Sequence, residues 1–236
     1  MDFFCQFSGM KPARTVITRS PHRTVGAIHA TWFQPEAIHH ESDLEAEAVR
    51  HLLLAPTVRR IEHQAAKLTY FDGTAERTHI PDLRLTEDRR KAFVEVKPAK
   101  FVAKHRLKFD ACAALLKNSG IDYFVCTEEH IGERGERAQM LLELAKRMAP
   151  SDALNSLVAW VRDKRRVDVD EALAAGYSEH LIGHAVGRRL VITDPSLLLA
   201  PGNWLSTQET ADELPSIEQW LGCSPWPPRP AATSKP

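Results

Sequence analysis

The chain has 236 residues, of which 43% are apolar, and its 31 Lys and Arg residues are balanced by 31 Asp and Glu residues. This length fits one large or two small domains, and the apolar content excludes a wholly disordered chain. No run of about 18 apolar residues occurs, and no apolar segment with a cleavage site follows Met1, so we expect no membrane partner, no secretory signal and a cytoplasmic location. Because the net charge is zero, any attraction to nucleic acid must come from local patches.

Residues 1–40 are predicted to form a basic N-terminal arm, because four Lys and Arg residues outnumber two acidic ones there and turn-forming residues recur. The pattern changes at residue 41. Leu44, Ala48 and Leu52 then recur at the spacing of an amphipathic helix. Ser42 is the expected N-cap of this helix.

Segments with strand character follow the first helix, separated by turn signals at Asp72-Gly73 and Glu87-Asp88. The expected strands are 58–64, 67–71, 77–86, 91–98 and 121–127, and the expected further helices are 99–120 and 134–148. A helix between two strands indicates a crossover connection. We therefore predict a mixed α/β domain over residues 41–149.

The region after Pro150 differs from the part before it. Three short amphipathic segments and a possible two-stranded wing predict a small winged-helix-like domain over residues 150–206. The remainder, residues 207–236, is rich in Pro and is predicted to be a disordered tail that begins with one short helix at most.

The most informative chemical pattern is Pro81-Asp82 followed by Glu95 and Lys97. Side chains alternate along a strand, so Glu95 and Lys97 share one face. If the preceding strand turns back around residues 88–89, residues whose numbers sum to about 177 face each other, and Asp82 lies opposite Glu95. Opposed carboxylates destabilise a sheet unless something neutralises them. A bound Mg²⁺ or Mn²⁺ would do so, and Lys97 would position or deprotonate an attacking water or neutralise charge at phosphorus.

Glu45 is the third carboxylate of this expected site. Its position on the predicted helix places it near the buried face, where an acidic side chain needs a partner. Metal binding is one interpretation. The alternative is structural, because Glu45 follows Ser42 at the spacing of a capping box, in which the carboxylate satisfies the helix N-terminus.

These segments together resemble the N-terminal domain of the TnsA-type transposon endonucleases, which belong to the PD-(D/E)xK restriction-endonuclease-like superfamily. The resemblance covers about residues 20–149. Within it SDLE at 42–45, PD at 81–82 and EVKP at 95–98 stand in the family's order, with the Gln64 region between the first two. It implies a restriction-endonuclease-like mixed sheet flanked by helices.

The resemblance also implies a function. The catalytic set would be Glu45, Asp82, Glu95 and Lys97, with the three carboxylates as ligands of Mg²⁺, for which Mn²⁺ substitutes. The reaction would be hydrolysis of a phosphodiester on the non-transferred strand at transposon ends. The implied partners are double-stranded DNA, a DDE-type transposase subunit, and an AAA+ transposition regulator contacted through the C-terminal domain.

A basic run follows the catalytic pattern and includes Lys100, Lys104, Arg106 and Lys108. On a continuous helix the three lysines share a face, which predicts contacts with the DNA backbone beside the cleavage site. The alternative is a solvated helix face. Two further functions remain open: a stand-alone restriction or repair-type nuclease, and a non-catalytic winged-helix adaptor, although the complete set of acids and lysine argues against the adaptor.

Overall fold

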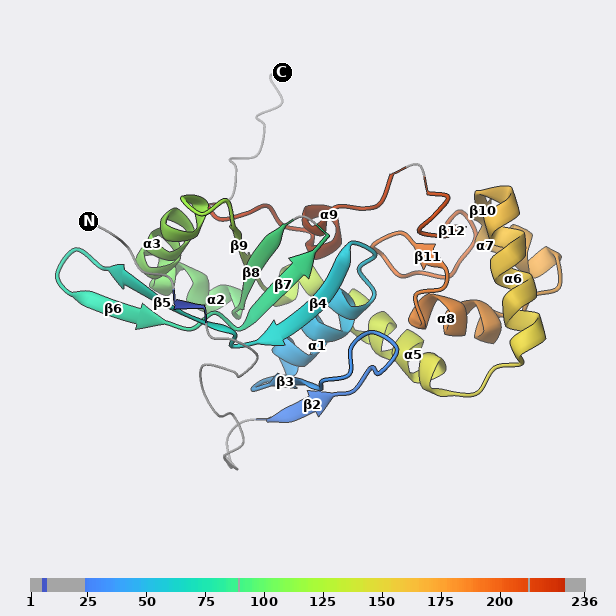
Figure 1. The fold of residues 1–236 in the computed structure, drawn as a ribbon, viewed down its shortest axis with the longest axis horizontal. Helices are drawn as coiled ribbons and strands as arrows, with labels where there is room; N and C mark the ends of the chain where they lie inside the picture. Colours follow the sequence, from blue (N-terminus) through green and yellow to red (C-terminus); the bar gives the residue numbers. More distant parts are fainter. Residues whose placement is uncertain (1–5, 8–23, 89, 212, 228–236) are drawn as a thin grey trace, which may run out of the picture.

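The computed structural model describes residues 6–7, 24–88, 90–211 and 213–227. As predicted, the protein is a mixed α/β structure in which helices flank a mixed sheet (Figure 1). The sheet has the order β4-β7-β8-β9, with β8 and β9 parallel and the other neighbours antiparallel. Its strands are β4 (Val58–His63), β7 (Leu83–Glu87), β8 (Lys91–Val96) and β9 (Asp122–Cys126).

The register between β7 and β8 is the one expected from the sequence. Leu83 pairs with Val94 and Leu85 pairs with Ala92, so the residue numbers of each pair sum to 177. Asp82 immediately precedes β7 and therefore lies beside the end of β8 that carries Glu95.

Strand β8 packs into two cores, one on each face of the sheet. Ala92, Val94 and Val96 belong to a core shared with α1 (Asp43–Leu53) and α5 (Arg134–Lys146). Phe93 belongs to the second core, where its partners come mainly from α3 and β9. This alternation confirms the period-two pattern of residues 91–98, and it fixes which side of the sheet receives Glu95.

The predicted strand over residues 77–86 is two strands in the structure. β6 (Glu76–His79) ends before Pro81, which has no N–H to donate to a sheet. β6 pairs with β5 (Ala66–Phe71), which also pairs with β1 (Gln6–Phe7). The β5–β6 hairpin extends beyond the end of the sheet, as Figure 1 shows.

The crossover from β8 to β9 is also broken where one helix was expected. It consists of α2 (Ala99–Val102), a 3₁₀ turn at Ala103–His105 and α3 (Arg106–Lys117). The 3₁₀ turn changes the direction in which the following side chains project. A short helix not predicted from the sequence, α4 (Glu128–Ile131), follows β9.

Of the expected N-terminal arm, the described part after residue 23 forms an antiparallel pair, β2 (Gly26–Ile28) with β3 (Ile38–His40). The basic residues on which the arm was predicted, Lys11 to Arg23, lie outside the described residues.

Residues 150–206 contain three helices and a three-stranded sheet of order β10-β12-β11. Their elements are α6 (Ser151–Lys164), β10 (Arg166–Asp168), α7 (Val169–Ala174), α8 (Glu179–Gly187), β11 (Ile192–Thr193) and β12 (Trp204–Ser206). Helix α8 packs closely on α5: a Cβ at Gly187 would lie 2.2 Å from the carbonyl oxygen of Leu141. One continuous core therefore includes residues from both sides of Pro150.

The short helix that was expected at most in the tail is present, and the segment around it is ordered and packed rather than disordered. Helix α9 (Ile217–Leu221) begins with a capping box formed by Ser216 and Gln219. Trp220 is 1% exposed, stacks on His51 with ring centroids 5.3 Å apart, and donates from Nε1 to the His51 carbonyl oxygen at 2.9 Å. Residues 228–236 of the expected tail lie outside the described residues.

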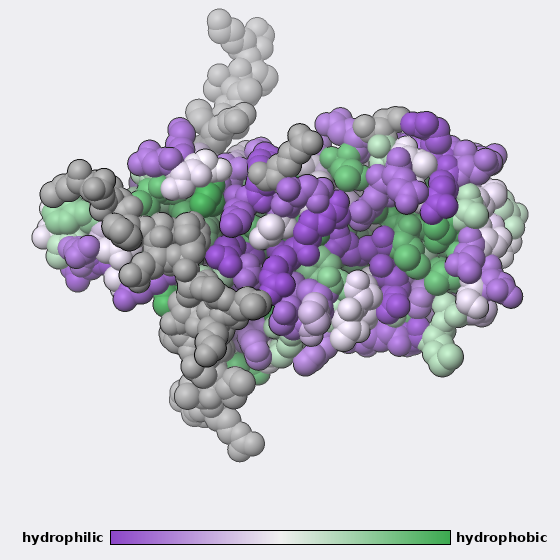
Figure 2. Space-filling model, viewed as in Figure 1, coloured by the Kyte–Doolittle hydropathy of each residue, from purple (hydrophilic) through white to green (hydrophobic). Residues whose placement is uncertain are grey.

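Hydrophilic side chains cover most of the face seen in Figure 2. Among the helices of the described residues, none has the length and apolar character needed to cross a membrane.

Replacing Trp220 with Ala is expected to lower the free energy of unfolding by about 3–5 kcal/mol, because it removes a buried aromatic ring and its hydrogen bond to α1. Urea denaturation of the full chain measures this loss. Leu107→Ala, at a side chain that is 77% exposed, is the control and should change stability by less than about 0.5 kcal/mol. Equal effects of the two substitutions would show that α9 is not part of the folded core.

Candidate active site

Asp82 lies where β7 begins, and its surroundings disfavour a charge. Its Oδ2 atom accepts a hydrogen bond from the Val96 N–H at 2.8 Å, and its carbonyl oxygen accepts one from the Gln64 N–H at 2.8 Å. Burial raises the pKa of Asp82 well above its usual value, and the negative charges of Glu95 and Glu45 raise it further. A positive charge placed beside Asp82 would therefore favour its ionised form.

Glu95 is 1% exposed and has the opposite character. His79 Nε2 lies 2.8 Å from its Oε2 atom, while Lys108 Nζ lies 3.0 Å and Lys97 Nζ 3.5 Å from its Oε1 atom. Burial opposes ionisation, but the contact with His79 and the charges of the two lysines outweigh it and lower the pKa of Glu95. The site therefore contains one ionised carboxylate with several partners and one carboxyl with few.

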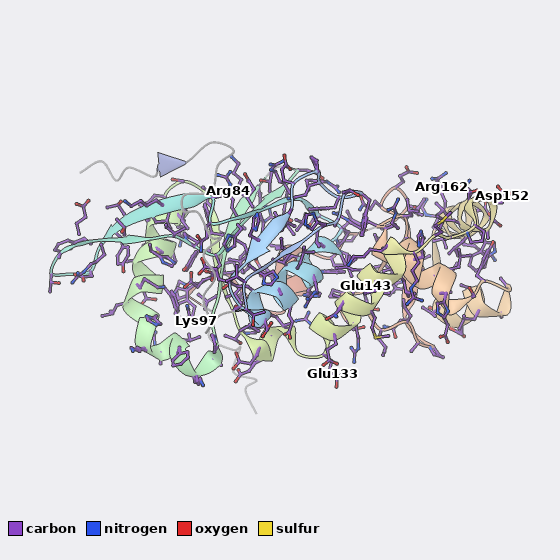
Figure 3. The ribbon with its side chains drawn as sticks, turned by 90° about the horizontal axis from the view of Figure 1, so that it is seen from below. Arg84, Lys97, Glu133, Glu143, Asp152 and Arg162 are labelled. Atoms are coloured by element: carbon purple, nitrogen blue, oxygen red, sulfur yellow. The ribbon has the colours of Figure 1, made fainter. Side chains whose placement is uncertain are left out.

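Lys97 occupies the junction between β8 and the crossover helices (Figure 3). Its N–H donates to the Cys126 carbonyl oxygen at 2.9 Å, which continues the parallel pairing of β8 with β9. Its side chain is 27% exposed and lies on the same face as Glu95, as the sequence predicts. The ammonium group thus reaches both the buried carboxylate and solvent.

Glu45 is buried near the N-terminus of α1, as expected, but its contacts are those of a cap. Ser42 Oγ accepts from the Glu45 N–H at 3.1 Å and donates to Oε1 at 3.1 Å, and the Glu41 N–H donates to Oε2 at 2.8 Å. His63 Nε2 lies 3.6 Å from Oε2. Although burial opposes ionisation, the His63 contact and the hydrogen bonds lower the pKa of Glu45. The structural alternative is therefore present in part: Ser42 caps the helix, while the Glu45 carboxylate accepts from the Glu41 N–H and not from that of the N-cap.

The three predicted metal ligands are near one another without forming a ligand set. Within the described ranges, no group of three or more His, Cys, Asp and Glu side chains is arranged to hold a metal ion. Glu45 and Glu95 are each engaged by their own hydrogen-bond and ion-pair partners. Their assignment as ligands, together with that of Asp82, stays a prediction.

The donor chemistry nevertheless fits a hard divalent cation. Mg²⁺ is usually held by one or two carboxylates and completes its shell with water and substrate phosphate oxygens. Asp82 and Glu95 supply two carboxylates on adjacent strands, and each raises the cost of charging the other unless a cation lies between them. A site built on these two residues thus supplies the kind and number of protein ligands that Mg²⁺ or Mn²⁺ usually has.

The structure corrects the predicted basic stripe. The 3₁₀ turn interrupts the helix, so Lys100 and Lys104 are exposed whereas Lys108 turns inward and donates to Glu95. Arg106 is exposed and lies 3.8 Å from Asp110. The predicted contact of Lys108 with DNA depends on one continuous helix, which would place Lys108 on the same face as Lys100 and Lys104.

His79 and Tyr123 were not identified from the sequence. Tyr123 OH lies 3.4 Å from His79 Nε2, which in turn contacts Glu95. The sequence contained one weak indication, because His79 stands three residues before Asp82. His79 comes close to the carboxylates because β6 ends at this residue.

A scan against protein-family models and a search of curated proteins each found no match to this chain. Functional inference therefore depends on the residues and their geometry.

Replacing Asp82 with Asn is expected to raise the free energy of unfolding of the metal-free protein at pH 7 by about 1 kcal/mol. The folded-state pKa lies above the unfolded one, so the unfolded chain binds fewer protons and stability falls as the pH rises from about 4 through the raised pKa. Asn removes this charge and keeps an oxygen for the Val96 N–H. Urea denaturation between pH 4 and 8 measures the effect.

The control is Asp122→Asn, at an acid that begins β9. It should change the free energy of unfolding at pH 7 by less than about 0.5 kcal/mol. A variant with Asn at position 82 that is less stable than the unaltered chain at pH 7 would contradict the strained state of Asp82.

Proposed function

We propose that this chain is a TnsA-type, metal-dependent DNA endonuclease that acts in the cytoplasm and hydrolyses a phosphodiester on the non-transferred strand at transposon ends. The observation that carries the proposal is the placement of Asp82 beside Glu95 across β7 and β8, with Lys97 on the same face. The order of the motifs along the chain supports it, because SDLE begins α1, PD immediately precedes β7 and EVKP spans the end of β8.

Asp82 and Glu95 would hold Mg²⁺ or Mn²⁺, and Glu45 would add negative charge from α1, since its charge already acts on Asp82. When bound, the cation would supply Lewis-acid stabilisation of the phosphate and lower the pKa of a bound water. Glu95 can act as a ligand of the cation and still accept the hydrogen bond from its lysine partner, because each carboxylate oxygen has two lone-pair sites.

Lys97 would act on the substrate directly. Its ammonium group is partly exposed at the edge of the acidic site, where a scissile phosphate must approach. There it would orient the attacking water and neutralise the charge that develops on the phosphate oxygens. In the reaction the water oxygen forms a bond to phosphorus and loses a proton, while the bond to the leaving oxygen breaks and that oxygen takes up a proton.

Exposed cations beside the site would hold the DNA backbone. Lys100, Lys104 and Arg106 project from the α2–α3 crossover, and two residues separate this crossover from β8. Contacts with phosphates fix the position of a duplex without reading its sequence. Lys108 is not part of this proposed surface, because it is paired with Glu95.

The second region would serve protein partners. Its order of helix, strand, two helices and two strands supports a winged-helix assignment. Residues Leu181 to Gly187 of α8 are buried, so this helix offers little surface to base edges. An AAA+ regulator is therefore the proposed partner of this domain, and a DDE-type transposase subunit that of the assembled enzyme.

The proposal predicts Mg²⁺-dependent nicking of supercoiled DNA that carries the element ends, when the neighbouring transposase and AAA+ proteins are present. Asp82→Asn should reduce the nicking rate by about 10³-fold or more, because it removes a cation ligand from the site. Gel analysis of the nicked product measures the rate.

Asp122→Asn is the matched control and should cut at the rate of the unaltered chain. Nicking that needs no partner would indicate a stand-alone nuclease. The endonuclease proposal fails if the folded chain cuts in no mixture, which would favour the adaptor, or if Asp82→Asn cuts as fast as the control.

Lys97→Met is expected to lower the nicking rate by about 10²-fold or more, because it removes the ammonium group beside the phosphate. This variant should still bind Mn²⁺ in the absence of DNA, as measured by titration calorimetry. Lys97→Arg restores part of the rate if the residue acts by its charge, and none if it must give up a proton. A Lys97→Met variant as active as the unaltered chain would remove Lys97 from the mechanism.

A further inference from the structure

We infer that Lys108 is a positioning residue of the proposed endonuclease: it neutralises Glu95 and thereby leaves the Lys97 ammonium group available to the substrate phosphate. The inference rests on the proposed function. It assigns a task within the site to a residue that the catalytic motif does not include.

The distances separate the tasks of the two lysines. Both ammonium groups approach the same oxygen of Glu95, but Lys108 Nζ lies at 3.0 Å and makes a hydrogen bond, whereas Lys97 Nζ lies at 3.5 Å. Because charge-assisted hydrogen bonds are shorter than about 3 Å at their strongest, Lys108 is the tighter partner. The carboxylate attracts the Lys97 ammonium group but leaves its N–H donors available to another partner.

The fold holds Lys108 in this place. The neighbouring Phe109 is fully buried in the second core and anchors the start of α3. Lys108 Nζ also lies 4.7 Å from the centre of the Phe109 ring, which attracts a cation. The Lys108 side chain is 20% exposed, so little of it is available to a DNA backbone.

A contact between Lys108 and DNA would also be costly. If Lys108 left Glu95 for a phosphate, the buried carboxylate would keep His79 on Oε2 and only the more distant Lys97 on Oε1. Removing one partner of a buried charge pair is strongly unfavourable. The arrangement therefore favours a lysine that stays on Glu95 throughout the reaction.

The consequence for Lys97 follows from competition for one oxygen. Without Lys108, Lys97 is the remaining ammonium group on Oε1, and the buried carboxylate draws it inward. Its distance from the substrate phosphate then increases, and displacements of about 1 Å reduce rates by about 10²-fold. Loss of Lys108 should thus slow the chemical step and leave DNA affinity unchanged.

The test compares Lys108→Gln with Lys108→Arg in the full chain, assembled with its partner proteins on DNA that carries the element ends. Single-turnover kinetics give the cleavage rate constant, and DNA titrations at several salt concentrations give the Kd. We expect Lys108→Gln to lower the rate constant by about 10²-fold with the Kd within about twofold of the unaltered value. Lys108→Arg keeps the charge and should recover most of the rate.

Two reference variants come from the same crossover. Lys117→Gln, at the end of α3, should change neither quantity. Lys104→Gln should raise the Kd and reduce the salt dependence of binding by about one phosphate contact. If Lys108→Gln behaves like Lys104→Gln, with a raised Kd and an unchanged rate constant, Lys108 is a DNA contact and the inference is overturned.

A readout without cleavage separates this inference from the proposed function. Ammonium-detected NMR of the metal-free protein reports the hydrogen exchange of Lys97. In Lys108→Gln its ammonium protons should exchange more slowly, because Lys97 takes over the bond to Glu95. An unchanged Lys97 signal overturns the inference, even if the unaltered chain proves not to cut DNA.

Discussion

The central constraint of the site is the burial of two carboxyl groups, Asp82 and Glu95, where two neighbouring strands meet: burial raises the pKa of Asp82, and the negative charge of Glu95 raises it further. Glu95 is compensated by His79 on one oxygen and by lysines on the other. Asp82 has the Val96 N–H, and its pKa is raised. Because the charge of Glu95 is neutralised by more partners than that of Asp82, Glu95 is ionised, whereas Asp82 favours its protonated form.

This inequality connects the fold to the proposed chemistry. A structural pair of acids would gain stability if both were neutralised by side chains or if one were replaced by an amide. Retaining Asp82 in a setting that disfavours its charge stores unfavourable electrostatic energy, which a divalent cation would release. Strain of this kind is characteristic of sites in which function takes precedence over stability.

Much of this arrangement could be predicted from the sequence, because side chains alternate along a strand and the residue numbers of paired positions in a hairpin have a constant sum. The period of two placed Glu95 and Lys97 on one face, and the turn near residue 88 fixed the register with Asp82. The helix spacing placed Glu45 near the buried face. These inferences need only local geometry.

The differences between the expected and the observed structure have separate causes. The stripe of lysines assumed a continuous helix, whereas a 3₁₀ turn at Ala103–His105 redirects Lys108 into the site. The Pro-rich composition after residue 206 suggested disorder, but the capping box at Ser216 and the buried ring of Trp220 form and anchor α9. Likewise, His79 approaches Glu95 only through the tertiary path of β6. The contacts of Trp220 with His51 and of His79 with Glu95 depend on packing between segments distant in the sequence.

The most direct test of this account is a crystal of the full chain soaked in Mn²⁺ and measured for anomalous scattering. The account predicts a manganese peak about 2 Å from carboxylate oxygens of Asp82 and Glu95, as for other hard divalent cations of this size. Lys108 should remain on Glu95, and the peak should vanish in Asp82→Asn. A soaked crystal with no manganese at these oxygens would contradict the claim that the opposed carboxylates form a cation site.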